Sequence, residues 1–206
     1  MSQVPGYFNA SIQGTTALVK YLLGKQSDLT VSSLHGNKYR AAYGGSGVSL
    51  YSGANQSGVT TSAGLATTYA GLCLSNPAAS GFNLSVRRVR GAFIVAPATV
   101  TGINLIIGYA AGGITAHTTP VTPTPGLING STVPVGKLDA ACTLVGTPTY
   151  YGPLAETASA TSLLAFSEDV EGAILIPPGG YMAIGTTIAG PAAGFMGGIE
   201  WTEAVQ

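Results

Sequence analysis

The chain has 206 residues, of which only 8% are charged, against roughly a quarter in ordinary soluble proteins. Eight Lys and Arg balance eight Asp and Glu, and a formal net charge of zero argues against a nucleic-acid-binding protein. The uncharged stretches 41–86 and 91–136 are interrupted throughout by Gly, Ser, Thr and Pro, so they do not predict membrane-spanning helices, which need about 20 apolar residues in a row. The segment 15–24 is too short for a signal peptide and contains Lys20, so we expect synthesis and use in a cytosol.

Residues 1–75 predict an extended N-terminal arm with little regular structure. The stretch 44–58 (GGSGVSLYSGANQSG) has too few apolar side chains to order itself, which is typical of a linker or of an arm that orders against a neighbour. Interspersed tyrosines favour the arm, because tyrosine is enriched at protein interfaces. The candidate interface residues here are Tyr7, Tyr21, Tyr39, Tyr43 and Tyr51.

Residues 76–206 predict an all-β domain, a β-sandwich or jelly roll, because short alternating runs are separated by turn residues. A long loop is expected over 115–134, and 162–171 reads as a short helix or as a loop that ends in a solvated acidic turn. The expected strands cover 83–87, 92–95, 103–109, 138–144, 173–176, 181–187 and 195–202.

Residues suited to catalysis or metal binding are few, and we expect no enzyme, no metal and no cofactor. His35 and His117 are the only histidines, and neither has a ligand partner at a suitable spacing. The carboxylates form two groups, 168–171 and 200–203, without the spacing of a calcium loop. Cys73 and Cys142 read as buried thiols of a reducing compartment.

Charge is unevenly distributed along the chain. Residues 1–103 hold seven basic groups and one acidic group, whereas 104–206 hold one basic group and seven acidic ones. Arg87, Arg88 and Arg90 form a basic cluster on a predicted strand, with Arg88 and Arg90 on one face and Arg87 on the other. We expect this strand to meet an acidic surface, either on the main partner or on the 168–171 turn of a neighbouring copy.

Five motifs carry a resemblance to a known family: TTYAGLCLSNPAASGFNLSVRRV (67–89), APA (96–98), ITAHTTPVTP (114–123), EGAILIPPGGYMAIGTT (171–187) and GGIEW (197–201). Over about residues 30–203 the chain resembles a family of proteins encoded among the structural genes of tailed phages. The Leu-Ser-Asn-Pro and Ile-Pro-Pro-Gly-Gly-Tyr segments are the most specific parts. The resemblance implies a virion structural protein and supplies no catalytic residues.

The expected function is therefore a capsid decoration, or cement, protein that stabilises the lattice of the major capsid protein by binding its assembled form. Its expected partners are its own copies, by analogy as a trimer, and the major capsid protein, with no nucleic acid and no membrane. It would be made in the bacterial cytoplasm and located on the capsid surface. The alternatives are a tail, baseplate or head-fibre component with a receptor- or glycan-binding sandwich, and a soluble lectin-like module.

Overall fold

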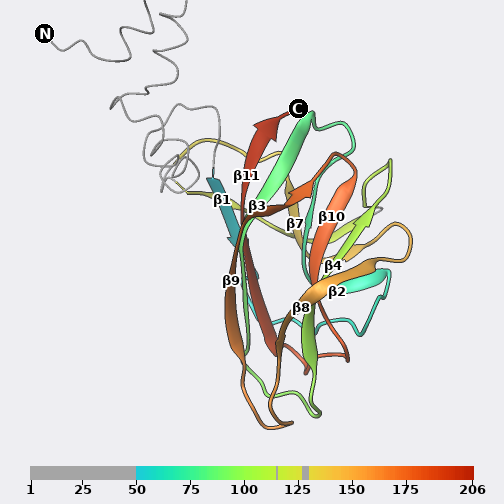
Figure 1. Ribbon diagram of the computed structural model, residues 1–206, viewed down its shortest axis with the longest axis vertical. Coiled ribbons are helices and arrows are strands. Elements are labelled where there is room, and N and C mark those ends of the chain that lie inside the picture. Colours follow the sequence, from blue (N-terminus) through green and yellow to red (C-terminus); the bar gives the residue numbers. More distant parts are fainter. Residues whose placement is uncertain (1–49, 115, 127–129) are drawn as a thin grey trace, which may run out of the picture. The chain divides into compact units, whose positions relative to one another are not determined.

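Eleven β-strands and their connecting loops make up the part of the chain that the computed structural model describes, residues 50–114, 116–126 and 130–206 (Figure 1). The strands form two antiparallel sheets. Sheet A consists, in spatial order, of β6 (Thr124–Pro125), β1 (Leu50–Ala54), β11 (Phe195–Val205), β3 (Phe82–Phe93) and β9 (Ala165–Ile176). Sheet B consists of β5 (Ala116–Val121), β7 (Lys137–Thr143), β2 (Thr68–Ser75), β10 (Gly180–Thr186), β4 (Gly102–Tyr109) and β8 (Thr149–Glu156).

The order of the strands is that of a jelly roll. From β1 to β4 and from β8 to β11, successive strands alternate between the sheets, and the pairs β1–β11, β2–β10, β3–β9 and β4–β8 are nested inside one another. The remaining strands, β5, β6 and β7, are an insertion between β4 and β8 that widens both sheets. The predicted all-β sandwich is confirmed. Among the described residues there is no helix that could cross a membrane.

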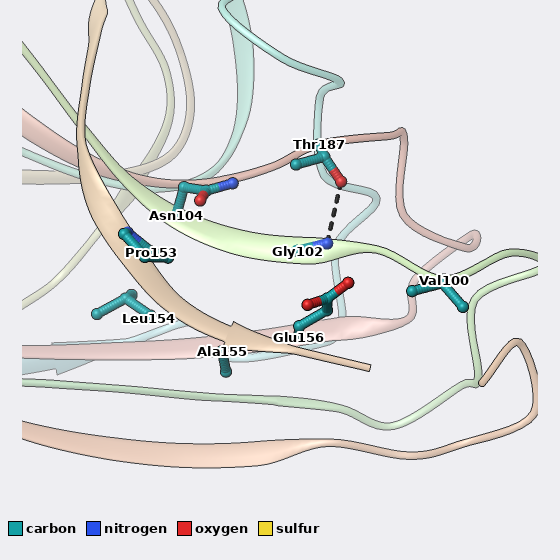
Figure 2. Close-up of a pocket in the computed structure, with 8 residues that line it drawn as sticks. All are labelled: Val100, Gly102, Asn104, Pro153, Leu154, Ala155, Glu156 and Thr187. Carbon is teal, nitrogen blue, oxygen red and sulfur yellow. Dashed lines mark hydrogen bonds between the residues drawn. The ribbon is translucent and has the colours of Figure 1, made fainter. Parts of the chain in front are cut away.

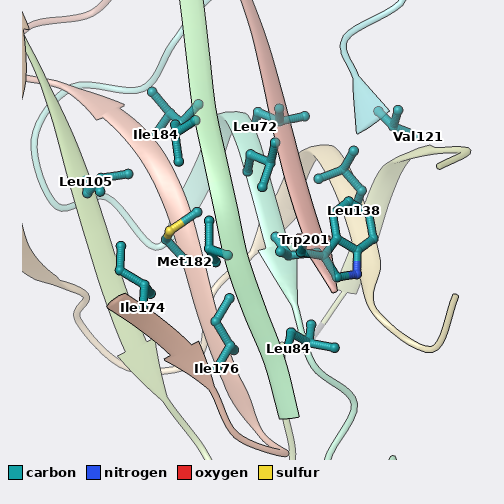
Figure 3. Packing of buried hydrophobic residues seen from close by; sticks show 14 of the residues in the cluster. Leu72, Leu84, Leu105, Val121, Leu138, Ile174, Ile176, Met182, Ile184 and Trp201 are labelled. Carbon is teal, nitrogen blue, oxygen red and sulfur yellow. The ribbon is translucent and has the colours of Figure 1, made fainter. Parts of the chain in front are cut away.

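The main core lies between the two sheets and follows from the alternation along each strand (Figure 3). Leu72 and Leu74 of β2 point into it, as do Met182 and Ile184 of β10, and Trp201 of β11 is fully buried there. Burying each such side chain contributes about 1.5–3 kcal/mol, which makes this cluster the main source of stability.

A second cluster lies on the opposite face of sheet B. Cys73, Ile106 and Ala183 alternate with core-facing neighbours and are also fully buried. Leu65 and Ile114, from the segments before β2 and after β4, pack against this cluster. The central strands β2 and β10 are therefore covered on both faces, which explains why they are apolar at nearly every position.

The sandwich begins earlier in the chain than the predicted boundary between residues 75 and 76. Leu50–Ala54 and Thr68–Ser75 are strands of sheets A and B, so the expected lack of regular structure does not hold for this part of 1–75. The segment 50–54 pairs with β11 along its whole length and buries Tyr51 and Gly53, alternating with half-buried neighbours. Residues 1–49 lie outside the described residues, and the arm remains a prediction for them.

Two further segments differ from expectation. The predicted loop 115–134 contains β5 and β6, edge strands with a neighbour on one side only; their threonines and Pro120 are exposed, and Pro125 is half-buried. The segment 162–171, predicted as a helix or an acidic turn, is mostly the first half of β9. Its acidic residues are compatible with a strand because β9 is the edge of sheet A and exposes its side chains.

Candidate interaction surface

Of the five tyrosines predicted to lie at an interface, one belongs to the described part of the chain. Tyr7, Tyr21, Tyr39 and Tyr43 lie outside the described residues. Tyr51 lies in the core instead of at a free surface: it is 4% exposed, and its ring centroid is 5.9 Å from that of Trp201, its partner on β11.

The basic strand β3 meets its acidic partners within the same chain, contrary to the expectation of an intermolecular contact. Arg88 Nε lies 2.5 Å from Asp169 Oδ1 on β9, and Arg90 Nη2 lies 2.6 Å from Glu200 Oε1 on β11. The hydrogen bond to Asp169, followed by the charge of Glu200, raises the pKa of Arg88. These pairs are partly exposed and each stabilises the fold by less than about 1 kcal/mol, but they neutralise the outer face of sheet A.

Arg87 fills an irregularity in the pairing of β3 with β9. The register shifts between Val86 and Arg88, and the residues of β9 from 170 to 173 bulge opposite Arg87. A Cβ atom on Gly172 would lie 2.8 Å from Ser85 Oγ and 3.3 Å from Arg87 Nη1, so Arg87 lies beside Ser85, away from the core-facing Val86. The bulge thus overturns the simple alternation that placed Arg87 on the face opposite Arg88.

The carboxylate of Glu203 has a structural role in the fold. Its Oε1 accepts hydrogen bonds from Gly136 N at 2.8 Å and Trp201 Nε1 at 3.1 Å, and its Oε2 accepts one from Val135 N at 3.0 Å. The side chain is buried. It holds the segment that leads into β7 against β11 and satisfies the indole nitrogen in the core.

His117 pairs with a buried carboxylate on the neighbouring strand. Its Nδ1 lies 2.7 Å from Asp139 Oδ2, and burial raises the pKa of Asp139 while the hydrogen bond to His117 opposes that rise. Cys73 and Cys142 are free and buried, as predicted, and a hydrogen bond with Cys142 together with burial raises the pKa of the Cys73 thiol. Within the described ranges, no three His, Cys, Asp or Glu side chains are grouped so that they could hold a metal ion.

Carboxylates without an ion pair lie where β8 and β9 contact each other; β8 is an edge strand of sheet B, and β9 is an edge strand of sheet A. Residues 149–176, which comprise these strands and the loop between them, contain four carboxylates and no Lys, Arg or His. Among the described residues, Glu156, Glu168 and Glu171 have neither an ion pair nor a hydrogen bond, and all three are exposed. We call this region the β8–β9 side.

The β8–β9 side also exposes large apolar side chains. Tyr150 and Tyr151 on β8 are 44% and 52% exposed, and Leu163 and Leu175 are each 63% exposed. Tyrosine is enriched at protein interfaces, and exposed apolar side chains concentrated in one region mark a candidate surface for contact with another protein. The alternation of β8 is broken at Gly152-Pro153, so the sequence pattern does not predict this strand. The absence of basic residues after Lys137 does indicate that this part of the chain carries unpaired negative charge.

The strand edges on this side are unsuited to pairing with a further strand. Pro153 lacks an N–H group, and the register of β8 against β4 shifts at two places. The bulge opposite Arg87 interrupts β9 in the same way. A partner would therefore bind mainly through side chains rather than by extending a sheet.

A hollow of about 500 Å³ lies between β4 and the end of β8 (Figure 2). Val100, Pro153 and Leu154 contribute apolar walls, Glu156 contributes a carboxylate, and Gly102 leaves space because it has no side chain. An apolar wall with one carboxylate suits a long side chain with an aliphatic stem and a cationic end, such as Lys or Arg.

Comparisons of the chain with family models, with curated proteins and with solved structures found no match. The relation to tailed-phage structural proteins therefore remains a prediction from the motifs of the sequence.

Proposed function

We propose that this protein is a structural subunit of a tailed-phage virion, and specifically a capsid decoration protein that binds its own copies and the major capsid protein. The observation that carries the proposal is the β8–β9 side, where two strands and the loop between them expose tyrosines and leucines as well as carboxylates that have no partner in the described part of the chain. Leaving such a surface uncovered is unfavourable, whereas covering it on a lattice of many copies favours the assembled state.

The fold and the use of polar groups support the same proposal. A jelly roll encloses its core between two sheets and is a common fold of capsid subunits. The buried carboxylates Asp139 and Glu203 bind groups of the protein itself, and Asp169 and Glu200 pair with arginines. The family resemblance over residues 30–203 supplies the choice of a phage virion.

Quantitative mass spectrometry of purified phage particles tests the proposal. A copy number comparable to that of the major capsid protein is the expected result. A far smaller copy number would favour the tail, baseplate or head-fibre alternative, and absence from the particle would refute a virion role.

A second measurement addresses the surface itself. Replacing Leu163 and Leu175 by Ser removes exposed apolar area without disturbing the core, so we expect a normal melting temperature but weaker binding to capsids. The matched control replaces Val133, which is 81% exposed and lies outside 149–176, and it should bind normally. Equal binding by the leucine variant and the control would remove the β8–β9 side from the proposal.

A further inference from the structure

The chain has no net charge because the segment before the sandwich and the sandwich itself carry opposite net charges. Residues 1–49 contain four basic residues and one acidic residue, which gives a net charge of +3. Residues 50–206 contain four basic and seven acidic residues, which gives −3. One part of the chain therefore has the charge that would neutralise the other.

The exposed carboxylates of the sandwich that have no ion pair lie in one region, where Arg87 brings one guanidinium close to Gly172. The pairs Arg88–Asp169 and Arg90–Glu200 neutralise each other, and Glu203 is buried among N–H groups. The exposed carboxylates that remain are Glu156, Glu168 and Glu171, all on the β8–β9 side. Glu168 lies two positions from Phe166 and two from Val170, which pack on the core, so it shares their inward-facing side of the edge strand, the side toward sheet B.

We propose that residues 1–49 of one copy bind the β8–β9 side of a second copy. This inference rests on the proposed function, because it states which contact joins neighbouring subunits. The basic residues of the segment would meet Glu156, Glu168 and Glu171, and its tyrosines would cover exposed apolar side chains between them, such as Leu163 in the loop from β8 to β9. The segment supplies Lys20, Lys25, Lys38 and Arg40 together with Tyr7, Tyr21, Tyr39 and Tyr43.

Other occupants fit this surface less well. A second copy of the β8–β9 side would bring like charges together, and nucleic acid would bring phosphates to the carboxylates. An added strand meets Pro153 and the bulge in β9. The hollow beside Glu156, with its walls of Val100 and Leu154, suits the lysine or arginine side chain that the segment offers.

Residues 1–49 contribute to assembly only if they bind a neighbouring copy and not their own. The described part begins at Leu50 on β1, and β11 and β3 separate this strand from β9 within sheet A. A segment bound to its own copy would neutralise charge without joining subunits. Contact with a neighbour would link each subunit to the next and repeat around a closed ring.

Two complementary variants of the full-length chain test the proposal. The first changes the four basic residues of the segment to Glu: Lys20→Glu, Lys25→Glu, Lys38→Glu and Arg40→Glu. The second reverses the sandwich: Glu156→Lys, Glu168→Lys and Glu171→Lys. A matched control makes the same +6 change in net charge by adding six lysines at exposed positions outside 149–176: Ser57→Lys, Thr67→Lys, Thr118→Lys, Thr122→Lys, Ser131→Lys and Thr132→Lys. Thermal melting confirms that each variant folds, and sedimentation velocity at low salt measures self-association.

We expect either reversed variant alone to associate about tenfold or more weakly than the wild-type chain, because several ion pairs become repulsive. Mixing the two variants should restore association, since the acidic segment of one then meets the basic side of the other. The control should associate like the wild type, and raising the salt concentration should weaken wild-type association.

Unchanged association of both single variants would overturn the inference, as would failure of their mixture to associate. Equal weakening by the control would also overturn it, because the effect would then come from total charge. These results are separate from the copy number in particles: a protein abundant on the capsid whose variants show no complementarity keeps the proposed function and loses this contact.

Discussion

The most informative single substitution is Glu203→Gln, which keeps the shape of the side chain and removes its charge. The glutamine oxygen can still accept from Gly136 N and Trp201 Nε1, but its NH₂ group then faces Val135 N–H. One hydrogen bond to a charged group is lost, at about 1.5–3 kcal/mol, and the other two become neutral and weaker. Because the desolvation of the carboxylate is also relieved, we expect a net loss of about 2 kcal/mol in the free energy of unfolding.

Urea denaturation measures this loss directly, and thermal melting should show a decrease of about 4–8 °C for a domain of this size. Glu203→Ala leaves all three donors without an acceptor and should cost about 4 kcal/mol. Glu156→Gln is the control, since that carboxylate is exposed and should change stability by less than about 0.5 kcal/mol. If Glu203→Gln is as stable as this control, the hydrogen bonds of Glu203 do not stabilise the fold.

The other predictions concern pH, backbone conformation and surface charge. The raised pKa of Asp139 means that its protonated form is favoured in the folded state, so its stabilising contribution is complete below the usual value of 3.8 and is lost as the pH rises through the raised pKa. Urea midpoints from pH 3 to 7 should show this slope in the wild type, and a slope no smaller in Asp139→Asn would contradict it. Gly172→Ala forces a φ of 87° on a residue with a side chain and should cost about 1–3 kcal/mol by urea denaturation, whereas Gly152→Ala, with open space around its Cβ, should be nearly neutral. Arg88→Glu should lower stability by less than about 1 kcal/mol and leave self-association unchanged, with Asp169→Arg restoring the loss; weaker association at unchanged stability would return the basic strand to the interface.

Much of the sandwich could be predicted because its central strands alternate. Leu84 and Val86 point into the core on β3, and Ile103 and Leu105 do so on β4, as their period of two predicts. The turn at Pro177–Gly179 could also be predicted, because proline cannot continue a ladder and glycine permits a positive φ. In these segments the local pattern and the tertiary environment agree.

The strands that were missed depend on partners far away in the sequence. Tyr51 is buried because Trp201, 150 positions later, lies opposite it, and nothing in the surrounding glycines and serines reports that pairing. Edge strands such as β8 and β9 have one neighbour only, so exposed acidic and polar residues replace the alternation. The sequence alone predicts an acidic turn for the carboxylates of β9 and an external partner for the arginines of β3, because it does not show that these two strands pair.

The placement of charge limits how copies of this protein can be arranged. Every Asp, Glu, Lys and Arg of the described part lies on a strand, so the described loops at both ends of the sandwich are uncharged. Uncharged loops can contribute contact area, but they do little to fix one orientation of a neighbour, because register is set mainly by complementary charge. The outer face of sheet A carries charges that pair within the chain, which leaves the β8–β9 side as the region with several unpaired charges of one sign. One such region per subunit is sufficient to orient a neighbour, and it requires a basic counterpart, which the charge of residues 1–49 provides.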